Sequence, residues 1–424
     1  MSNSTTEMPP TASAHRAAFF RQSGWLMVAN VGCGVMMWAV HLLNKKIPAE
    51  EYGVFGVLLA VAMFVPNMPL QMVFAQQTAR ALATHREREL AGMIRLAWLG
   101  TLGLWLLVAG AALFWQADIL ARWHITNPAG LWVTLPVILF SLWLPMFLGV
   151  MQGQQNFLWL GWSNIFNGAG RLGLAAFIVL LLGGYAAGMM IGVFLGLAVA
   201  SGIGIWQTRS LWRRAAQPFA WRSLLGQIIP LMLGFGAVQF FLTADTMFVK
   251  AYFPGDVTGF YVGAGTLSRA LLWLVLPLAT VMFPKIVHST ARSEESNLLG
   301  MVMLGTAVLA AGGAAGLWLL GPWIVKWVYQ DSYVRVALSV LPWYAWAMVP
   351  LALANVLINN LLARSQFRIV PVLVLLATAY GLALTQFHNT LVMVLQTLGG
   401  FNLLLLAVCA WFTWGGKAGT KRAR

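Results

Sequence analysis

The chain of 424 residues is 60% hydrophobic and only 9% charged, and its mean hydropathy is +0.77. Soluble globular domains usually carry about a quarter charged residues, so this composition excludes that class and indicates a polytopic membrane protein. The net charge of +15 would suggest a nucleic-acid partner in a soluble chain. Here the basic residues fall between apolar runs, as membrane topology requires, and we expect no nucleic-acid partner.

The N-terminal residues are polar and carry no basic stretch ahead of an apolar run, so we expect a cytoplasmic tail and no cleavable signal peptide. A spanning helix needs about 20 predominantly apolar residues. From Gly24 onward this rule predicts about twelve spans, which makes the chain an all-α membrane protein. The predicted spans are 24–43, 54–77, 91–115, 131–151, 157–182, 186–206, 226–249, 257–284, 298–320, 336–358, 369–385 and 391–414.

The distribution of basic residues predicts the orientation. Of the 26 Lys and Arg residues, Arg171 and Arg269 fall deep within predicted helices. The loops on one side hold only Lys45, Lys46, Arg122, Lys250, Lys326 and Arg335. All others, including those of both tails, lie on the opposite side, so the positive-inside rule places both termini in the cytoplasm.

Two short turns share one pattern. Residues 47–55 read I-P-A-E-E-Y-G-V-F, and residues 253–261 read F-P-G-D-V-T-G-F-Y. The residues that recur in the same order and spacing are Pro48, Glu50 and Gly53 in the first turn and Pro254, Asp256 and Gly259 in the second. We interpret them as marks of a six-helix module present twice, each turn closing the first hairpin of its half.

The basic segment Thr208 to Ser223 is the one plausible boundary between the halves. The predicted organisation is a cytoplasmic tail (1–22), a first six-helix bundle (23–207), a basic linker (208–224), a second six-helix bundle (225–414) and a basic cytoplasmic tail (415–424). Because six is even, both repeats insert the same way up, around a central cavity. Parallel repeats are typical of transporters that rock two bundles about a midplane site.

Sequence motifs of catalysis and cofactor binding are missing. The chain has no phosphate-binding loop, no H-E-x-x-H and no G-x-S-x-G. Cys33 and Cys409 lie far apart in apolar runs, so we expect neither a disulfide nor a metal site. We therefore predict no catalytic residues, no metal and no cofactor.

Two arginines inside predicted helices are the candidate substrate-binding residues. Arg171 and Arg269 lie near the middle of their spans, one in each half. Charge at that depth is costly and usually functional. Guanidinium groups bind phosphate oxygens through paired hydrogen bonds, so two arginines facing one cavity would hold a pyrophosphate. Asn164 and Asn167 precede Arg171, and Asn167 shares its helix face. The alternative is that the arginines snorkel or cap helices and that the asparagines form hydrogen bonds between helices.

Asp245 is an acid near the outer end of the seventh span. Three roles are open: binding a coupling proton or cation, pairing with Arg269 in the adjacent hairpin arm, or solvation at the membrane boundary.

The two turn motifs, together with V-M-Q-G-Q-Q-N-F at 150–157 and V-M-F-P-K-I-V at 281–287, resemble the polysaccharide-biosynthesis (Wzx-like) branch of the multidrug/oligosaccharidyl-lipid/polysaccharide (MOP) flippase superfamily. The resemblance implies a flippase that moves an oligosaccharide on a polyprenyl pyrophosphate carrier across the bacterial cytoplasmic membrane by alternating access. It also implies a cationic cavity, for which Arg171 and Arg269 are the matching positions. Members of the branch often have fourteen helices, against about twelve here.

The partners implied are the lipid-linked glycan, membrane lipids, glycan-assembly enzymes and a coupling proton or sodium ion. Two other functions remain open. A multidrug or organic-cation antiporter of the same superfamily would favour acids in the cavity, and the chain offers one acid against two arginines there. An integral-membrane polysaccharide polymerase or ligase would need a larger outer loop than this chain has.

Overall fold

The computed structural model describes residues 12–291 and 298–415, and predictions for residues 1–11, 292–297 and 416–424 lie outside it. Within the described residues the protein consists of helices and short connections, without a β-strand. The first half contains α1 (Ala12–Ala39), η1 (Val40–Lys46), α2 (Ala49–Met63), α3 (Asn67–Ala83), α4 (Glu87–Phe114), α5 (Gln116–Arg122), α6 (Ala129–Gly153), α7 (Phe157–Leu182) and α8 (Tyr185–Arg213). The second half contains α9 (Trp221–Tyr252), α10 (Gly255–Ala291), α11 (Leu298–Val328), α12 (Asp331–Ala363), η2 (Phe367–Ile369), α13 (Val370–Gln386), α14 (Leu391–Ala410) and η3 (Trp411–Gly415).

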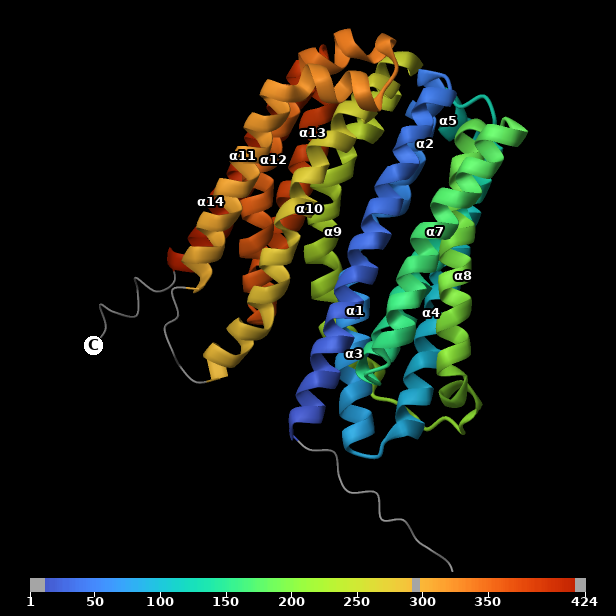
Figure 1. Cartoon of the computed structure of the whole chain (residues 1–424), viewed down its shortest axis with the longest axis vertical. Coiled ribbons are helices and arrows are strands. Elements are labelled where there is room, and N and C mark those ends of the chain that lie inside the picture. The colour runs from blue at the N-terminus through green and yellow to red at the C-terminus, as the bar shows by residue number, and fades with distance from the viewer. Residues whose placement is uncertain (1–11, 292–297, 416–424) are drawn as a thin grey trace, which may run out of the picture.

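The helices form two bundles that follow the chain order. In the first, α7 packs between α1 and α8, and α6 packs against α3 and α8. In the second, α12 packs against α10, α11 and α14, and α13 packs on α9. Figure 1 shows the two bundles side by side, close together where α2 and α10 begin and farther apart toward the opposite end.

The predicted fold class, an all-α integral membrane protein, is confirmed. In the described residues, eleven helices or helix pairs are long and apolar enough to cross a membrane. Helix α10, of 37 residues, is not among these eleven and corresponds to the predicted eighth span. Helix α5 occupies the loop between the third and fourth predicted spans, which the sequence left without structure, and it is too short to span.

The second predicted span, 54–77, is not one continuous helix. Helix α2 ends at Met63, and α3 begins at Asn67 after a break that contains Pro66. Proline has no backbone N–H and disfavours helical geometry in the residue before it, so the helix ends there. Gln239 of α9 donates a hydrogen bond to the carbonyl of Met63 at 2.6 Å, which satisfies a carbonyl at the break from the opposite bundle.

The two Pro-acid-Gly turns have equivalent local structures. Pro48 and Pro254 directly precede α2 and α10, and their carbonyls accept the first helical hydrogen bonds, from Tyr52 N at 3.0 Å and Thr258 N at 3.1 Å. Glu50 and Asp256 lie in the first helical turn, where a negative charge is favourable at the helix N-terminus.

The turns also meet each other. A Cβ atom added to Gly53 would lie 3.0 Å from the backbone nitrogen of Gly259, and one added to Gly259 would collide with the carbonyl oxygen of Ala49. Only glycine permits this approach. We call this end of the molecule, where α2 and α10 begin, the turn end. The contact between α2 and α10 here is the main junction of the bundles.

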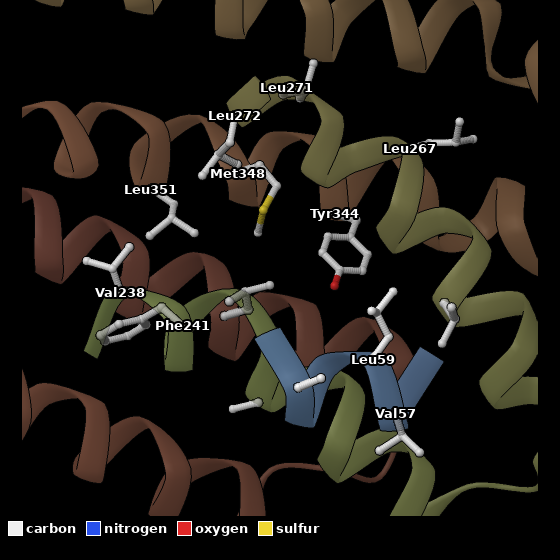
Figure 2. Close-up of a cluster of buried hydrophobic side chains, with 14 of the residues drawn as sticks. Val57, Leu59, Val238, Phe241, Leu267, Leu271, Leu272, Tyr344, Met348 and Leu351 are labelled. Atoms are coloured by element: carbon white, nitrogen blue, oxygen red, sulfur yellow. The ribbon is translucent and has the colours of Figure 1, made fainter. Parts of the chain in front are cut away.

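An apolar cluster continues the junction toward the middle of the molecule. Figure 2 shows side chains from α2, α9, α10 and α12 packed together, including Val57, Phe241, Leu267 and Tyr344. These residues are at most 5% exposed. The cluster joins one helix of the first bundle to three of the second, so burial of apolar side chains holds the bundles together here.

The connection between the bundles is shorter than the predicted linker 208–224. Helix α8 extends to Arg213 and α9 begins at Trp221, which leaves residues 214–220 without helix. This connection lies along α4: Arg214 forms an ion pair with Glu87, and Gln217 N donates to Arg88 O at 3.1 Å. The cytoplasmic tail predicted at 1–22 includes the start of α1, which begins at Ala12.

Candidate functional site

Arg171 lies in the middle of α7 and is only 7% exposed. Its Nε has no hydrogen-bond partner, and no ion pair involves it among the described residues. The backbone of α7 is held close to α8 here, since a Cβ on Gly196 would lie 2.8 Å from Arg171 N. A buried guanidinium without a partner is expensive, so this position is expected to be compensated by an anion or by water.

The two asparagines near Arg171 differ in their surroundings. Asn167, one turn before Arg171 on α7, is 8% exposed, and its Oδ1 has no hydrogen-bond partner. Asn164 donates to Asn30 Oδ1 of α1 at 2.7 Å, which is the interhelical bond that the sequence left open as an alternative. The structure therefore places an unsatisfied amide beside Arg171 and ties Asn164 to α1.

Arg269 of α10 forms an ion pair with Asp245 of α9. Its Nη2 lies 2.9 Å from Asp245 Oδ1 and 3.0 Å from Oδ2, and it also donates to Thr246 Oγ1 at 2.6 Å. The Arg269 side chain is 21% exposed, whereas that of Asp245 is 1% exposed. Of the three roles considered for Asp245, the structure contains the pairing with Arg269.

Two tyrosines complete the surroundings of Asp245. Tyr261 donates from its hydroxyl to Asp245 Oδ2 at 2.8 Å, and the Tyr344 hydroxyl donates to the same oxygen. Arg269 also lies over the Tyr344 ring, with its Cζ 5.4 Å from the ring centroid, a cation–π arrangement. The carboxylate thus has donors from α10 and α12, and its charge is balanced inside the second bundle.

These tyrosines were missed by sequence reasoning. The available signal was composition, since the chain has 8 tyrosines. The tyrosines that are at most 2% exposed are Tyr52, Tyr261, Tyr329, Tyr333, Tyr344 and Tyr380. A buried tyrosine hydroxyl usually has a hydrogen-bond partner, although those of Tyr333 and Tyr380 have none among the described residues. A buried tyrosine can therefore mark a polar site, as Tyr261 and Tyr344 do here.

His41 of η1 is a nearly buried polar residue, 9% exposed. His41 Nδ1 is 2.8 Å from the hydroxyl of Tyr52 in α2. This contact joins η1 to α2 within the first bundle.

The turn residues Pro48, Glu50, Gly53, Pro254, Asp256 and Gly259 lie at the turn end, away from the arginines along α2 and α10. Within residues 12–291 and 298–415 no three His, Cys, Asp or Glu side chains are grouped closely enough to hold a metal ion. The described site can bind a ligand through electrostatic interactions and hydrogen bonds. It contains one guanidinium without an ion-pair partner, one guanidinium paired with a carboxylate, and hydroxyl and amide groups between helices.

No family model matches the sequence, and no curated protein matches it. Solved structures match over nearly the whole chain. An inward-facing multidrug resistance MATE family transporter of the MOP superfamily has a TM-score of 0.72 at 13% identity, covering 91% of this chain and 94% of that one. The lipid II flippase MurJ in an inward closed conformation has a TM-score of 0.68 at 13% identity, covering 92% of this chain and 87% of that one.

A third match is the MATE multidrug transporter DinF-BH, with a TM-score of 0.63 at 11% identity, covering 92% of this chain and 95% of that one. The fold is therefore similar to that of these transporters, which include members of the MOP superfamily. The Wzx-like branch is a finer assignment that identities of 11–13% do not carry.

Proposed function

We propose that the protein is a flippase that moves an oligosaccharide on a polyprenyl pyrophosphate carrier across the bacterial cytoplasmic membrane for surface polysaccharide biosynthesis. In this proposal the two bundles alternate access to a site between them. Both termini lie in the cytoplasm, as the basic loops favour. The turn end then faces outward, and enzymes that assemble the glycan are the expected neighbours in the membrane.

The observation that carries the proposal is the uncompensated charge of Arg171. Its guanidinium is nearly buried in mid-helix and makes no ion pair with the described residues. A pyrophosphate supplies the two things this position lacks, negative charge and several strong acceptor oxygens. Asn167, with its unsatisfied amide oxygen one turn away, would lie beside the bound group.

Complementation tests the proposal. In a strain that lacks its own flippase, Arg171→Ala and Arg269→Ala are expected to abolish surface polysaccharide while the protein still inserts. Losing one charge-assisted hydrogen-bonding group costs about 1.5–3 kcal/mol, roughly 10- to 100-fold in substrate affinity. Arg122→Ala, in exposed α5, is the matched control and should complement fully. Normal polysaccharide in both site variants at equal membrane levels would exclude the cationic site.

A multidrug or organic-cation antiporter is the second candidate, favoured by the TM-score of 0.72 with a MATE transporter. An organic cation needs a free carboxylate, and the one acid deep in the helices, Asp245, is already paired with Arg269. Efflux of a cationic dye from energised vesicles separates the two functions. We expect no dye efflux, and efflux that is lost in Asp245→Asn would favour the antiporter.

The energy source proposed is a proton or sodium gradient, because the sequence has no nucleotide-binding motif. Flipping of a fluorescent lipid-linked substrate in proteoliposomes, with each gradient imposed separately, identifies the ion. A rate that responds to neither gradient would indicate uncoupled flipping.

A further inference from the structure

Lys250 is a charged residue that is not part of the candidate transport site. It lies in the last turn of α9, two residues before the helix ends at Tyr252, at the turn end, and is 0% exposed. Its Nζ has no hydrogen-bond partner. No ion pair involves it among the described residues. An ammonium group in this position is stripped of water without receiving a partner, which is among the most costly placements for a side chain.

Two acids of the other bundle act on Lys250. Glu50 and Glu51 of α2 both act electrostatically on Lys250, but each carboxylate is directed elsewhere. Glu51 accepts a hydrogen bond from Ala186 N, at the start of α8, at 3.1 Å. Glu50 is exposed and lies over Gly255, the first residue of α10. The two acids therefore reduce the cost of burying Lys250 without forming a bond to it.

Lys250 lies at the turn end, and the turn end is closed. Gly53 and Gly259 bring α2 and α10 into backbone contact. Nearby, Asn44 Nδ2 donates to Val328 O at 3.1 Å, and Gln330 Nε2 donates to Asn44 O at 2.8 Å. These bonds join η1 of the first bundle to the corner between α11 and α12 of the second. They oppose the separation that would let water reach Lys250.

We propose that Lys250 acts as a built-in opening element: the cost of its burial in the closed turn end favours separation of the bundles there. The closed state is held by the glycine contact and the two hydrogen bonds, and it is weakened by the unpaired ammonium. Separation returns water to Nζ and removes that cost. The balance keeps the closed turn end from becoming too stable for a transport cycle.

The reporter for this proposal is a cysteine at Thr258. Thr258 is 0% exposed, and its Cβ lies 3.2 Å from a Cβ built on Gly53, so it is covered only while the turn end is closed. Thr258→Cys is nearly isosteric. The protein is purified in lipid nanodiscs, where both membrane faces are open to reagent, and the rate of maleimide modification is measured. The chain without this substitution is the background, since Cys33 and Cys409 are buried.

Lys250→Met keeps roughly the length of the side chain and removes its charge. It is expected to slow modification of the Thr258→Cys reporter by about tenfold, because the closed turn end no longer buries an ammonium group. Glu50→Gln is expected to accelerate it by roughly fivefold, because the ammonium loses a compensating charge in the closed state. In the combined variant, the effect of Glu50→Gln should shrink, since no ammonium remains to compensate.

The two substitutions are expected to change the modification rate in opposite directions. This distinguishes the proposed role of Lys250 from an attraction between Lys250 and Glu50 that holds the bundles together. If Lys250 held the bundles together through Glu50, both substitutions would accelerate modification, and the proposal would be wrong. An unchanged rate in Lys250→Met would also overturn it, because the ammonium would then carry no cost. Lys250→Gln serves as a second neutral variant, and elution as a single species confirms that each protein is folded. The readout uses no substrate, so it stands apart from the proposed function.

Discussion

Asp245 determines how charge is balanced in the candidate site. It is the one acid deep within the predicted spans, and in the structure it is 0% exposed and receives donors from Arg269, Tyr261 and Tyr344. Arg269 is consequently neutralised within its own bundle. Arg171 has no such partner among the described residues, so the two arginines that the sequence treats as an equivalent pair are electrostatically different.

The ion pair should matter for stability when only one partner is removed. Asp245→Asn leaves Arg269 as an uncompensated charge in the second bundle and is expected to cost up to about 3 kcal/mol, the lower end for buried pairs because Arg269 keeps some exposure. The measurement is the thermal midpoint of the purified protein followed by size-exclusion chromatography. Asp245→Asn combined with Arg269→Met should recover part of the loss. A double variant as unstable as Asp245→Asn alone would show that the charge is not the cause.

At the scale of elements, the contact between α2 and α10 depends on the two repeat-marking glycines. Gly259→Val places branched carbons where the carbonyl of Ala49 lies. Overpacking of this kind typically costs about 1–3 kcal/mol. We expect a lower thermal midpoint and loss of complementation. Gly312→Val in α11, where an added Cβ meets nothing within 4 Å, is the matched control and should behave like the unaltered protein. Equal behaviour of the two variants would contradict a tight junction.

The break between α2 and α3 also contributes to the contact between the bundles. Broken spans in transporters place backbone carbonyls and helix ends at membrane depth, and they are tolerated only where protein or water satisfies them. Here the carbonyl of Met63 receives a hydrogen bond from Gln239 of the opposite bundle. The break therefore gives the junction a polar contact in the region where the remaining contacts, such as Phe64 with Phe240, are apolar.

At the scale of the whole molecule, the even number of spans predicts that both termini lie on one side of the membrane. Green fluorescent protein fused after Gly415 is expected to fluoresce, because we propose that the C-terminus lies in the cytoplasm. Alkaline phosphatase inserted after His124, beyond α5, should be active, because the same orientation places this loop outside. An active phosphatase at the C-terminus would reverse the orientation, and with it the assignment of the turn end to the outer face.

The sequence by itself determined the class and the approximate spans, and it predicts a doubling of the chain. Spans are set by the length of apolar runs against the membrane thickness, which is a local property. The repeat was visible because Pro48 and Pro254 start equivalent helices at the same spacing to Gly53 and Gly259. The short break at Phe64 to Pro66 was not visible as such, because the apolar run continues across it.

Only the tertiary structure decided which polar residues meet. Asp245 and Tyr344 are 99 residues apart, and Asn44 and Gln330 are 286 apart, so no local pattern could pair them. Burial of Lys250 is likewise a property of the tertiary structure, since its own helix end looks like an ordinary basic terminus. Apolar periodicity places a residue in a helix, but its partners are fixed by helix packing, and the balance of charge at the site follows from those partners.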